Sequence, residues 1–387
     1  MEKGKPRNLT LLVKPASSLC NMRCRYCFYA DEASRRSGTP GVMTPETARR
    51  LIDAAFAAVR EGGQVTFAFQ GGEPTLAGPD FFDAFCRYAR EHNTKNLTLS
   101  WSVQTNGLLI DSSWAAFFRE EGFLVGVSLD GTEALHDACR PDAEGNPTWK
   151  RAAAAAALLR KNRVNTNLLC VVTSRSAACS RKVYQTLKAT GIPYLQFIPC
   201  LDPLPGSPEA PAASRLTAKD YGFFLCRVFD LWWADWTGGQ AVNVRQFEDW
   251  IRVAVGLPPE MCATCGMCGG YLVAEADGSL YPCDFYALDE WRLGSLEDGE
   301  DSILSALRSP RMADFRRRSD EKPSACGRCR FFSLCRGGCP RNRIEQDGRT
   351  VNGLCDAFQM FFEYAEPRLR EAVRAVRSRA VSLHTPR

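Results

Sequence analysis

The chain has 387 residues, of which 45% are hydrophobic and 24% charged, and its formal net charge is +5. This composition is ordinary for a soluble globular protein, and the small net charge argues against a dedicated nucleic-acid binder. No segment reaches the roughly 18 apolar residues that a membrane-spanning helix needs, and the N-terminal apolar run is too short for a signal-peptide core. We therefore expect a cytoplasmic protein that binds neither nucleic acid nor membrane.

The first 200 residues alternate between strand-like and amphipathic helix-like segments. Strands joined by crossover helices form a parallel sheet, so six such units predict an α/β fold with a partial (βα)6 barrel. Ligands of such sheets bind at the carboxyl ends of the strands. The expected strands are Asn8–Lys14, Gln64–Phe69, Leu97–Val103, Leu124–Leu129, Asn165–Val172 and Tyr194–Pro199. The expected helices are Pro45–Arg60, Asp80–Glu91, Ser112–Glu121, Thr148–Lys161 and Arg181–Thr190.

The remaining chain changes in composition twice. Leu201–Ser214 is rich in Pro, Ala and Gly and is typical of a linker or loop. The next part predicts two bridging helices, Lys219–Trp236 and Val244–Val255, and the chain ends in a helix over Phe358–Arg377. We therefore expect a barrel over residues 1–215, a helical bridge over 216–260, a cysteine-rich domain over 261–357 and a terminal helix over 358–387.

Cysteine is the outlier of the composition, with 18 residues. A reducing cytosol disfavours disulfides, so the spacing of the cysteines carries the information. Six lie in ordinary strand or helix contexts and are interpreted as small core residues. These are Cys86, Cys139, Cys170, Cys179, Cys200 and Cys226.

Cys20, Cys24 and Cys27 follow the first expected strand in SLCNMRCRYCFY, a C-x3-C-x2-C spacing. Three thiolates on one loop can hold three irons of a [4Fe–4S] cluster and leave the fourth iron open. The alternative is a zinc site with a distant fourth ligand, but the chain has three histidines and the spacing matches neither usual zinc pattern. The motif resembles that of the radical S-adenosylmethionine superfamily. The resemblance implies that the open iron chelates the amino and carboxylate groups of the cofactor's methionine part.

Three more motifs, FQGGEP, QTNG and SLDG, end the second, third and fourth expected strands. Gly71 and Gly72 allow a close backbone approach to a ligand, or form a plain turn, and Glu73 offers a carboxylate to an ammonium group. Arg140 is also compatible with a surface ion pair. The resemblance implies that cofactor contacts come from Tyr26, Gly71, Gly72, Glu73, Gln104, Asn106, Ser128, Asp130, Arg140 and Gln196.

Nine further cysteines lie between Cys262 and Cys355. Eight thiolates would ligate two [4Fe–4S] clusters, whereas zinc ribbons are the alternative for C-x2-C pairs. The C-x2-C-x5-C-x3-C run from Cys326 to Cys339 resembles the SPASM extension of peptide-modifying radical enzymes. That resemblance implies a domain with two auxiliary clusters.

Nearly the whole chain resembles the anaerobic sulfatase-maturating enzymes, through KPASSLCNMRCRYCFY, FQGGEPTL, SVQTNG, VGVSLDG, LQFIPCL, YPCDFY and the last cysteine run. The resemblance implies two ligand sets. Cys265 departs from the pattern and is either a spare thiol or a replacement for Cys262 or Cys268. The first auxiliary set is Cys262, Cys268, Cys283 and Cys339, and the second is Cys326, Cys329, Cys335 and Cys355.

Asp284 directly follows Cys283 in YPCDFY. The resemblance implies that Asp284 is the base that deprotonates the reacting thiol of the substrate, and that Tyr29 and Gln70 lie near the substrate. A base must reach its proton and have a usable pKa. The alternative is an aspartate that caps a turn.

The activity implied is the oxidation of a sulfatase Cys or Ser, within a Cys/Ser-x-Pro-x-Arg segment, to Cα-formylglycine. It would require three [4Fe–4S] clusters, S-adenosylmethionine and an electron donor of the flavodoxin or ferredoxin type. One alternative is a thioether-forming maturase of a ribosomal peptide, whose usual N-terminal recognition domain is not expected in the 19 residues before Cys20. The others are a small-molecule dehydrogenase, with a shorter cluster domain, and a zinc-bound nucleic-acid module, with a basic face.

Overall fold

The computed structural model describes residues 4–38, 41–204 and 215–383, with side chains to residue 378. Its main sheet has ten strands in the order β10-β9-β8-β1-β2-β3-β4-β5-β6-β7, and β8 and β1 to β7 run parallel. The six expected strands are all present. The strands are β1 Asn8–Val13, β2 Gln64–Phe69, β3 Thr98–Thr105, β4 Leu124–Ser128, β5 Asn165–Val172, β6 Tyr194–Pro199, β7 Asn243–Val244, β8 Leu272–Ala274, β9 Ser279–Tyr281 and β10 Gly294–Ser295.

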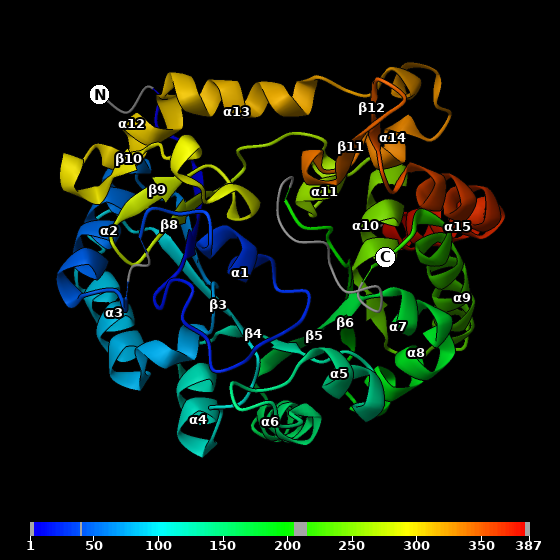
Figure 1. The fold of residues 1–387 in the computed structure, drawn as a ribbon, viewed down its shortest axis with the longest axis horizontal. Coiled ribbons are helices and arrows are strands. Elements are labelled where there is room, and N and C mark those ends of the chain that lie inside the picture. The colour runs from blue at the N-terminus through cyan, green and yellow to red at the C-terminus, as the bar shows by residue number, and fades with distance from the viewer. Residues whose placement is uncertain (1–3, 39–40, 205–214, 384–387) are drawn as a thin grey trace.

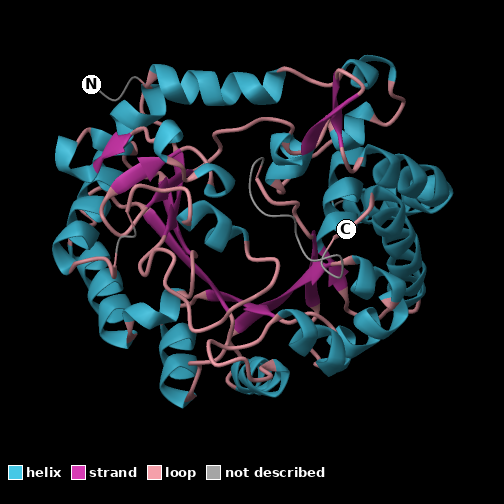
Figure 2. Cartoon of the chain, in the orientation of Figure 1, coloured by secondary structure: helices cyan, strands magenta, loops and turns pink. Residues whose placement is uncertain are grey.

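The sheet curves, and the crossover helices cover its outer face (Figures 1 and 2). Alternate residues of β2 are buried, so one set of side chains packs under the helices while the other set lines the inner face. A short helix, α1 Phe28–Ala33, lies on the inner side of the curve (Figure 1). The outer helices are α2 Pro45–Ala58, α3 Pro79–Glu91, α4 Ser112–Glu120, α5 Glu133–Cys139, α6 Trp149–Lys161, α7 Ser174–Ala178 and α8 Ser180–Ala189.

The rest of the described chain contains two long helices and many short elements. The bridging helix α9 Ala218–Thr237 packs along the terminal helix α15 Cys355–Leu383, and the rings of Phe229 and Phe361 lie 5.4 Å apart. The other elements are α10 Arg245–Ala254, α11 Cys262–Cys265, α12 Ser302–Arg308, α13 Pro310–Asp320, α14 Phe332–Cys335, β11 Arg343–Gln346 and β12 Arg349–Asn352. The 3-10 turns are η1 Pro74–Ala77, η2 Asp284–Tyr286, η3 Asp289–Trp291, η4 Leu296–Asp298, η5 Ser324–Arg328 and η6 Pro340–Asn342.

The structure differs from the expected domain limits in two places. The cysteine-rich segment supplies β8, β9 and β10 to the barrel sheet, because β8 pairs with the edge of β1 and extends the sheet on that side. The terminal helix begins at Cys355, three residues earlier than expected. Residues 205–214 of the expected linker lie outside the described residues.

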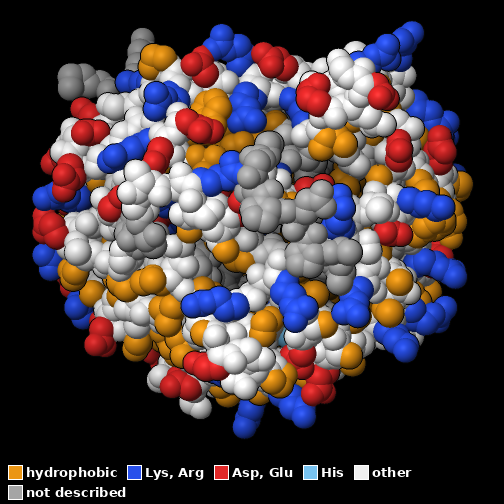
Figure 3. All heavy atoms as spheres, viewed as in Figure 1, with side chains coloured by type: hydrophobic (Ala, Val, Ile, Leu, Met, Phe, Trp, Pro, Cys, Tyr) orange, Lys and Arg blue, Asp and Glu red, His pale blue; other side chains and the backbone are white. Residues whose placement is uncertain are grey.

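Two general expectations can be compared with the described residues. Among the described residues, no helix is both long and apolar enough to cross a membrane. On the face seen in Figure 3, basic and acidic side chains are interspersed.

Candidate active site and cysteine clusters

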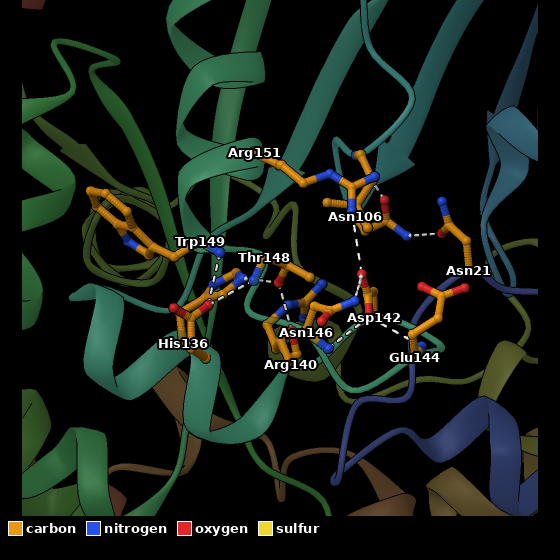
Figure 4. Close-up of polar contacts among 12 residues, drawn as sticks. Asn21, Asn106, His136, Arg140, Asp142, Glu144, Asn146, Thr148, Trp149 and Arg151 are labelled. Carbon is orange, nitrogen blue, oxygen red and sulfur yellow. Dashed lines mark hydrogen bonds and ion pairs between the residues drawn. The ribbon is translucent and has the colours of Figure 1, made fainter.

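The loop with Cys20, Cys24 and Cys27 starts shortly after β1 and is held mainly by backbone contacts. The amides of Arg23 and Arg25 donate to the carbonyls of Pro141 and Cys139, both at 2.9 Å. Cys27 donates from its amide to the Cys24 carbonyl at 3.2 Å. The segment after β4 therefore fixes the backbone of the cysteine loop, and Figure 4 shows part of this segment beside Asn21.

Burial makes the thiolate forms of Cys20 and Cys24 unfavourable in the protein alone. The pKa of Cys20 is raised to about 11 and that of Cys24 to about 12, mainly by burial and in smaller part by the charge of nearby Cys27. In the described part of the chain, no three His, Cys, Asp or Glu side chains form the compact group that one metal ion needs. The three close thiols fit an iron–sulfur cluster, whose positive irons would offset the cost of burying thiolates.

Gly71 and Gly72 are required by a close backbone approach. A Cβ atom on Gly72 would lie 2.1 Å from the Leu19 carbonyl oxygen, and Gly71 has a φ of +118°. The Gly72 amide donates to the Ser17 carbonyl and the Glu73 amide to the Leu19 carbonyl, both at 2.8 Å. The glycines thus join the second strand to the start of the cysteine loop.

Glu73 is fully buried, and its carboxylate is occupied by neighbouring donors. Oε1 accepts the Thr75 amide at 3.1 Å, the Thr75 hydroxyl at 2.6 Å and the Thr105 hydroxyl at 2.8 Å. Oε2 accepts the Asn106 amide at 2.7 Å. Burial raises the pKa of Glu73, and these donors oppose the shift. The carboxylate therefore fixes the ends of β2 and β3, which leaves the glycine backbone as the more available part of the motif.

Asn106 connects the third strand to the cysteine loop. Its Nδ2 donates to Asn21 Oδ1 at 2.7 Å and lies 3.9 Å from the Cys20 sulfur (Figure 4). Gln104 and Ser128 are half-buried at the ends of the neighbouring strands. The QTNG motif thus supports the cysteine loop directly.

The buried Asp130 and Arg140 form a group with the half-buried Tyr26 of this loop. The Tyr26 hydroxyl donates to Asp130 Oδ2 and accepts from Arg140 Nη1 at 3.0 Å. Burial raises the pKa of Asp130, and the Arg140 guanidinium opposes the shift. Arg140 is 7% exposed, so it is not a surface ion pair. Its charge also lowers the pKa of the nearby Cys24 thiol, against the effect of burial.

His136 holds this group together and was not expected to take part. Burial and the Arg140 charge lower the pKa of His136 to about 2, so the ring is neutral. Its Nδ1 accepts the Asp130 amide at 3.2 Å, so its Nε2 donates to the Thr148 hydroxyl at 3.0 Å (Figure 4). Thr148 in turn donates to the Arg140 carbonyl at 2.6 Å.

Gln70 lies directly after β2, and Gln196 lies within β6. The Gln70 amide donates to the Val13 carbonyl at 2.9 Å, and its side chain is half-buried. Gln196 Oε1 accepts from Arg245 Nη1 at 2.8 Å. Gln196 is therefore bonded to the helical bridge.

Asp284 is 5% exposed and belongs to a buried charged cluster. Its Oδ2 accepts the Tyr29 hydroxyl at 2.6 Å, and its Oδ1 lies 3.3 Å from Lys14 Nζ. Lys14 Nζ also lies 3.5 Å from Glu32 and 3.4 Å from Glu275. The sequence did not lead us to expect Lys14, Glu32 and Glu275 beside Asp284. A lysine that ends an otherwise apolar strand was the available signal.

The described C-terminal cysteines form two groups in space. The pKa of Cys262 is raised to about 12, mainly by burial and in smaller part by nearby Cys339, Cys268 and Cys265. Cys339 likewise raises the pKa of Cys283, after burial. The other group surrounds Cys335, whose pKa burial raises to about 11, with further contributions from Cys355, Cys326 and Cys329.

Cys265 lies at the margin of the first group. Its sulfur is 3.8 Å from the Pro259 carbonyl oxygen, and its charged neighbours are Asp249 and Arg336. Its position fits a spare thiol better than a replacement for Cys262 or Cys268.

Comparisons with known proteins identify the domains. The radical SAM superfamily matches residues 15–175, and the SPASM iron–sulfur cluster-binding domain matches residues 262–330. The chain is 41% identical over 364 residues to the cysteine-type anaerobic sulfatase-maturating enzyme of Clostridium perfringens, over 93% of this chain and 97% of the relative. It is 33% identical to the serine-type enzyme of Klebsiella aerogenes, over 93% and 86% of the two chains.

Solved structures give the same result. The structure of anSMEcpe with bound AdoMet and Cp18Cys peptide has a TM-score of 0.89 at 40% identity, over 95% of this chain and 99% of that chain. SuiB of Streptococcus suis bound to its precursor peptide SuiA has a TM-score of 0.59 at 15% identity, over 87% and 72% of the chains, and shows a shared fold. The chain belongs to the anaerobic sulfatase-maturating enzymes, which are radical SAM oxidoreductases with a SPASM domain.

Proposed function

We propose that this enzyme oxidises a cysteine in a sulfatase polypeptide to Cα-formylglycine. The observation that carries the proposal is the bond between the Tyr29 hydroxyl and Asp284. Tyr29 follows the first cysteine motif by two residues, and Asp284 follows Cys283 by one. The pair therefore joins the two regions that the oxidation requires, next to the inner face of the barrel.

The cysteines are assigned as ligands of three [4Fe–4S] clusters. Cys20, Cys24 and Cys27 would hold the first cluster, whose open iron would bind S-adenosylmethionine. The segments around Tyr26, Gly72, Asn106, Asp130 and Arg140 would form the cofactor site beside that loop. One auxiliary cluster would be held by Cys262, Cys268, Cys283 and Cys339, and the other by Cys326, Cys329, Cys335 and Cys355.

The bound cluster and cofactor supply the radical chemistry of hydrogen abstraction. The protein's own side chains supply proton transfer and position. Asp284 accepts the proton of the substrate thiol, and Tyr29 holds one of the two carboxylate oxygens. Gln70, directly after β2, would contact the reacting residue.

Cysteine is proposed as the preferred substrate residue because the cysteine-type relative is 41% identical and the serine-type relative 33%. The cytoplasm is proposed as the compartment, since all 18 cysteines are free. The electron donor is proposed to be a flavodoxin or ferredoxin.

A peptide assay tests the function. A peptide of about 15–20 residues with a Cys-x-Pro-x-Arg segment should lose mass as formylglycine forms, with 5′-deoxyadenosine alongside. The matched Ser-x-Pro-x-Arg peptide should react more slowly. Formation of an intramolecular thioether alone would favour the thioether-forming alternative.

The variant Asp284→Asn tests the proposed base. The amide keeps the size of the side chain but cannot act as a comparable base, so formylglycine should form at least about 100-fold more slowly. S-adenosylmethionine should still be cleaved, and the iron content should match the parent. Loss of iron in step with activity would make Asp284 structural, whereas normal turnover would place the base elsewhere, with Tyr29 the next residue to test.

A further inference from the structure

Lys14 lies directly after β1 and is 3% exposed, although its side chain is charged. Its ammonium nitrogen lies 3.3 Å from Asp284, 3.4 Å from Glu275 and 3.5 Å from Glu32. These carboxylates come from three other places in the fold: η2, the end of β8 and α1. A buried cation among three buried carboxyl groups is costly to form, so the arrangement needs an explanation beyond surface charge.

Lys14 also contacts the glycine motif after β2 and Tyr29, which follows the first cysteine motif. A Cβ on Gly71 would lie 3.2 Å from Lys14 Cγ, so the lysine stem packs against the glycine motif. Lys14 Nζ lies 4.8 Å from the centre of the Tyr29 ring, on the residue that hydrogen-bonds Asp284. The Lys14 amide donates to the Ala274 carbonyl at 2.9 Å, which fixes the base of the side chain to β8.

The ion pairs of the cluster show which carboxyl groups have no cation other than Lys14 within ion-pair distance among the described residues. Arg36 pairs with Glu275 at 2.6 Å, so Glu275 has a second cation. For Asp284 and Glu32, Lys14 is the cation within ion-pair distance among the described residues. Burial raises the pKa of Glu32 to about 8 even though Lys14 opposes the shift. Lys14 is therefore the main compensation for the Asp284 carboxylate, with Glu32 and Glu275 holding the ammonium group in place.

We propose that Lys14 is a positioning residue for the oxidation, whose ammonium group holds the Asp284 carboxylate beside Tyr29 at the reacting thiol. Lys14 takes Oδ1 and Tyr29 takes Oδ2, so the two contacts together fix the orientation of the carboxylate plane. The inference rests on the proposed role of Asp284 as the base. The alternative is that the contact between Lys14 and Asp284 only holds β1, α1 and η2 together.

Two variants that share the change Glu32→Gln separate these two possibilities. Glu32→Gln removes the Glu32 carboxyl group, but Glu275 still holds the Lys14 ammonium group beside Asp284, so formylglycine formed per 5′-deoxyadenosine should stay at the parent value. Lys14→Met with Glu32→Gln removes the cation beside Asp284 together with the neighbouring carboxyl group that Lys14 also contacts. We expect this ratio to fall about 10–100-fold in the double variant, because small misplacements of a reacting group cost up to about 100-fold in rate.

Three further measurements accompany the ratio. Iron content and peptide affinity should match the parent in both variants, and kcat should fall in the double variant while KM changes little. Lys95→Met is the control for loss of a half-buried lysine far from the cluster, since Lys95 Nζ donates to the Phe56 carbonyl at 2.7 Å. It should leave the ratio unchanged.

Each outcome decides the inference. If the double variant forms as much formylglycine per 5′-deoxyadenosine as the parent, or if it fails to load iron, Lys14 has only a structural role and the inference is wrong. A parent enzyme that makes no formylglycine would instead overturn the proposed function itself.

Discussion

The two cysteine-rich regions are built in different ways. The loop with Cys20, Cys24 and Cys27 is fixed by backbone bonds to the segment after β4 and to the glycine motif after β2. The segment with the auxiliary cysteines consists of elements as short as the four residues of α11 and α14. The barrel thus positions the first group of thiols, whereas bound clusters would contribute much of the order in the second region.

The turn between Cys335 and Cys339 illustrates the second design. Arg336, Gly337 and Gly338 have φ values of +51°, +83° and +64°. A Cβ on Gly338 would lie 2.3 Å from Asn352 Nδ2, so this position requires glycine. Arg336 is a non-glycine residue in the left-handed region, which costs free energy, and ligation of the flanking Cys335 and Cys339 would compensate for it.

The largest expected effect is on the first region. Replacing Cys20, Cys24 and Cys27 with Ala should lower the iron content from about twelve to about eight per chain and abolish cleavage of S-adenosylmethionine. The midpoint of thermal unfolding should change by a few degrees at most, because the backbone bonds of the loop remain. Anaerobic iron and sulfide analysis with calorimetry would check both. Stoichiometric zinc without iron in the parent would overturn the cluster assignment.

A smaller effect on activity but a larger one on stability is expected in the second region. Replacing Cys326 and Cys329 with Ala should remove about four irons. It should also lower the unfolding midpoint by about 5–10 °C, which corresponds to a few kcal/mol in a domain of this size. Limited proteolysis should then cut between residues 322 and 354. An unchanged midpoint would remove the contrast between the two regions.

The same contrast describes what the sequence could predict. Strand limits and the cysteine spacing followed from local patterns, and Asn165–Val172 and Tyr194–Pro199 were predicted to the residue. The charged cluster could not be predicted, because Lys14 and Glu275 are distant in sequence and meet only when β8 pairs with β1. Glu73 was expected to face a ligand, and only the fold shows that donors from Thr75, Thr105 and Asn106 occupy its carboxylate.

Glu73→Gln probes how firmly the barrel holds the first region. Oε1 and Oε2 each accept a backbone amide, from Thr75 and Asn106, so a side-chain NH2 group faces an N–H donor in either orientation. We expect a loss of about 1–3 kcal/mol in the free energy of unfolding. Glu46→Gln, on the exposed face of α2, is the control and should change stability by less than about 0.5 kcal/mol. Equal effects of the two changes would show that the buried bonds contribute little.

The smallest expected effect concerns Cys265, the thiol at the edge of the first auxiliary group. Its sulfur contacts the Pro259 carbonyl, and Asp249 and Arg336 are its charged neighbours. Cys262 instead has Cys339 and Cys268 close by. Cys265→Ser should therefore keep the parent iron content and change stability by less than about 0.5 kcal/mol. The matched change Cys262→Ser should reduce the iron content. If the two variants exchanged these outcomes, Cys265 would be the ligand, and the first auxiliary cluster would lie closer to Asp249 and Arg336.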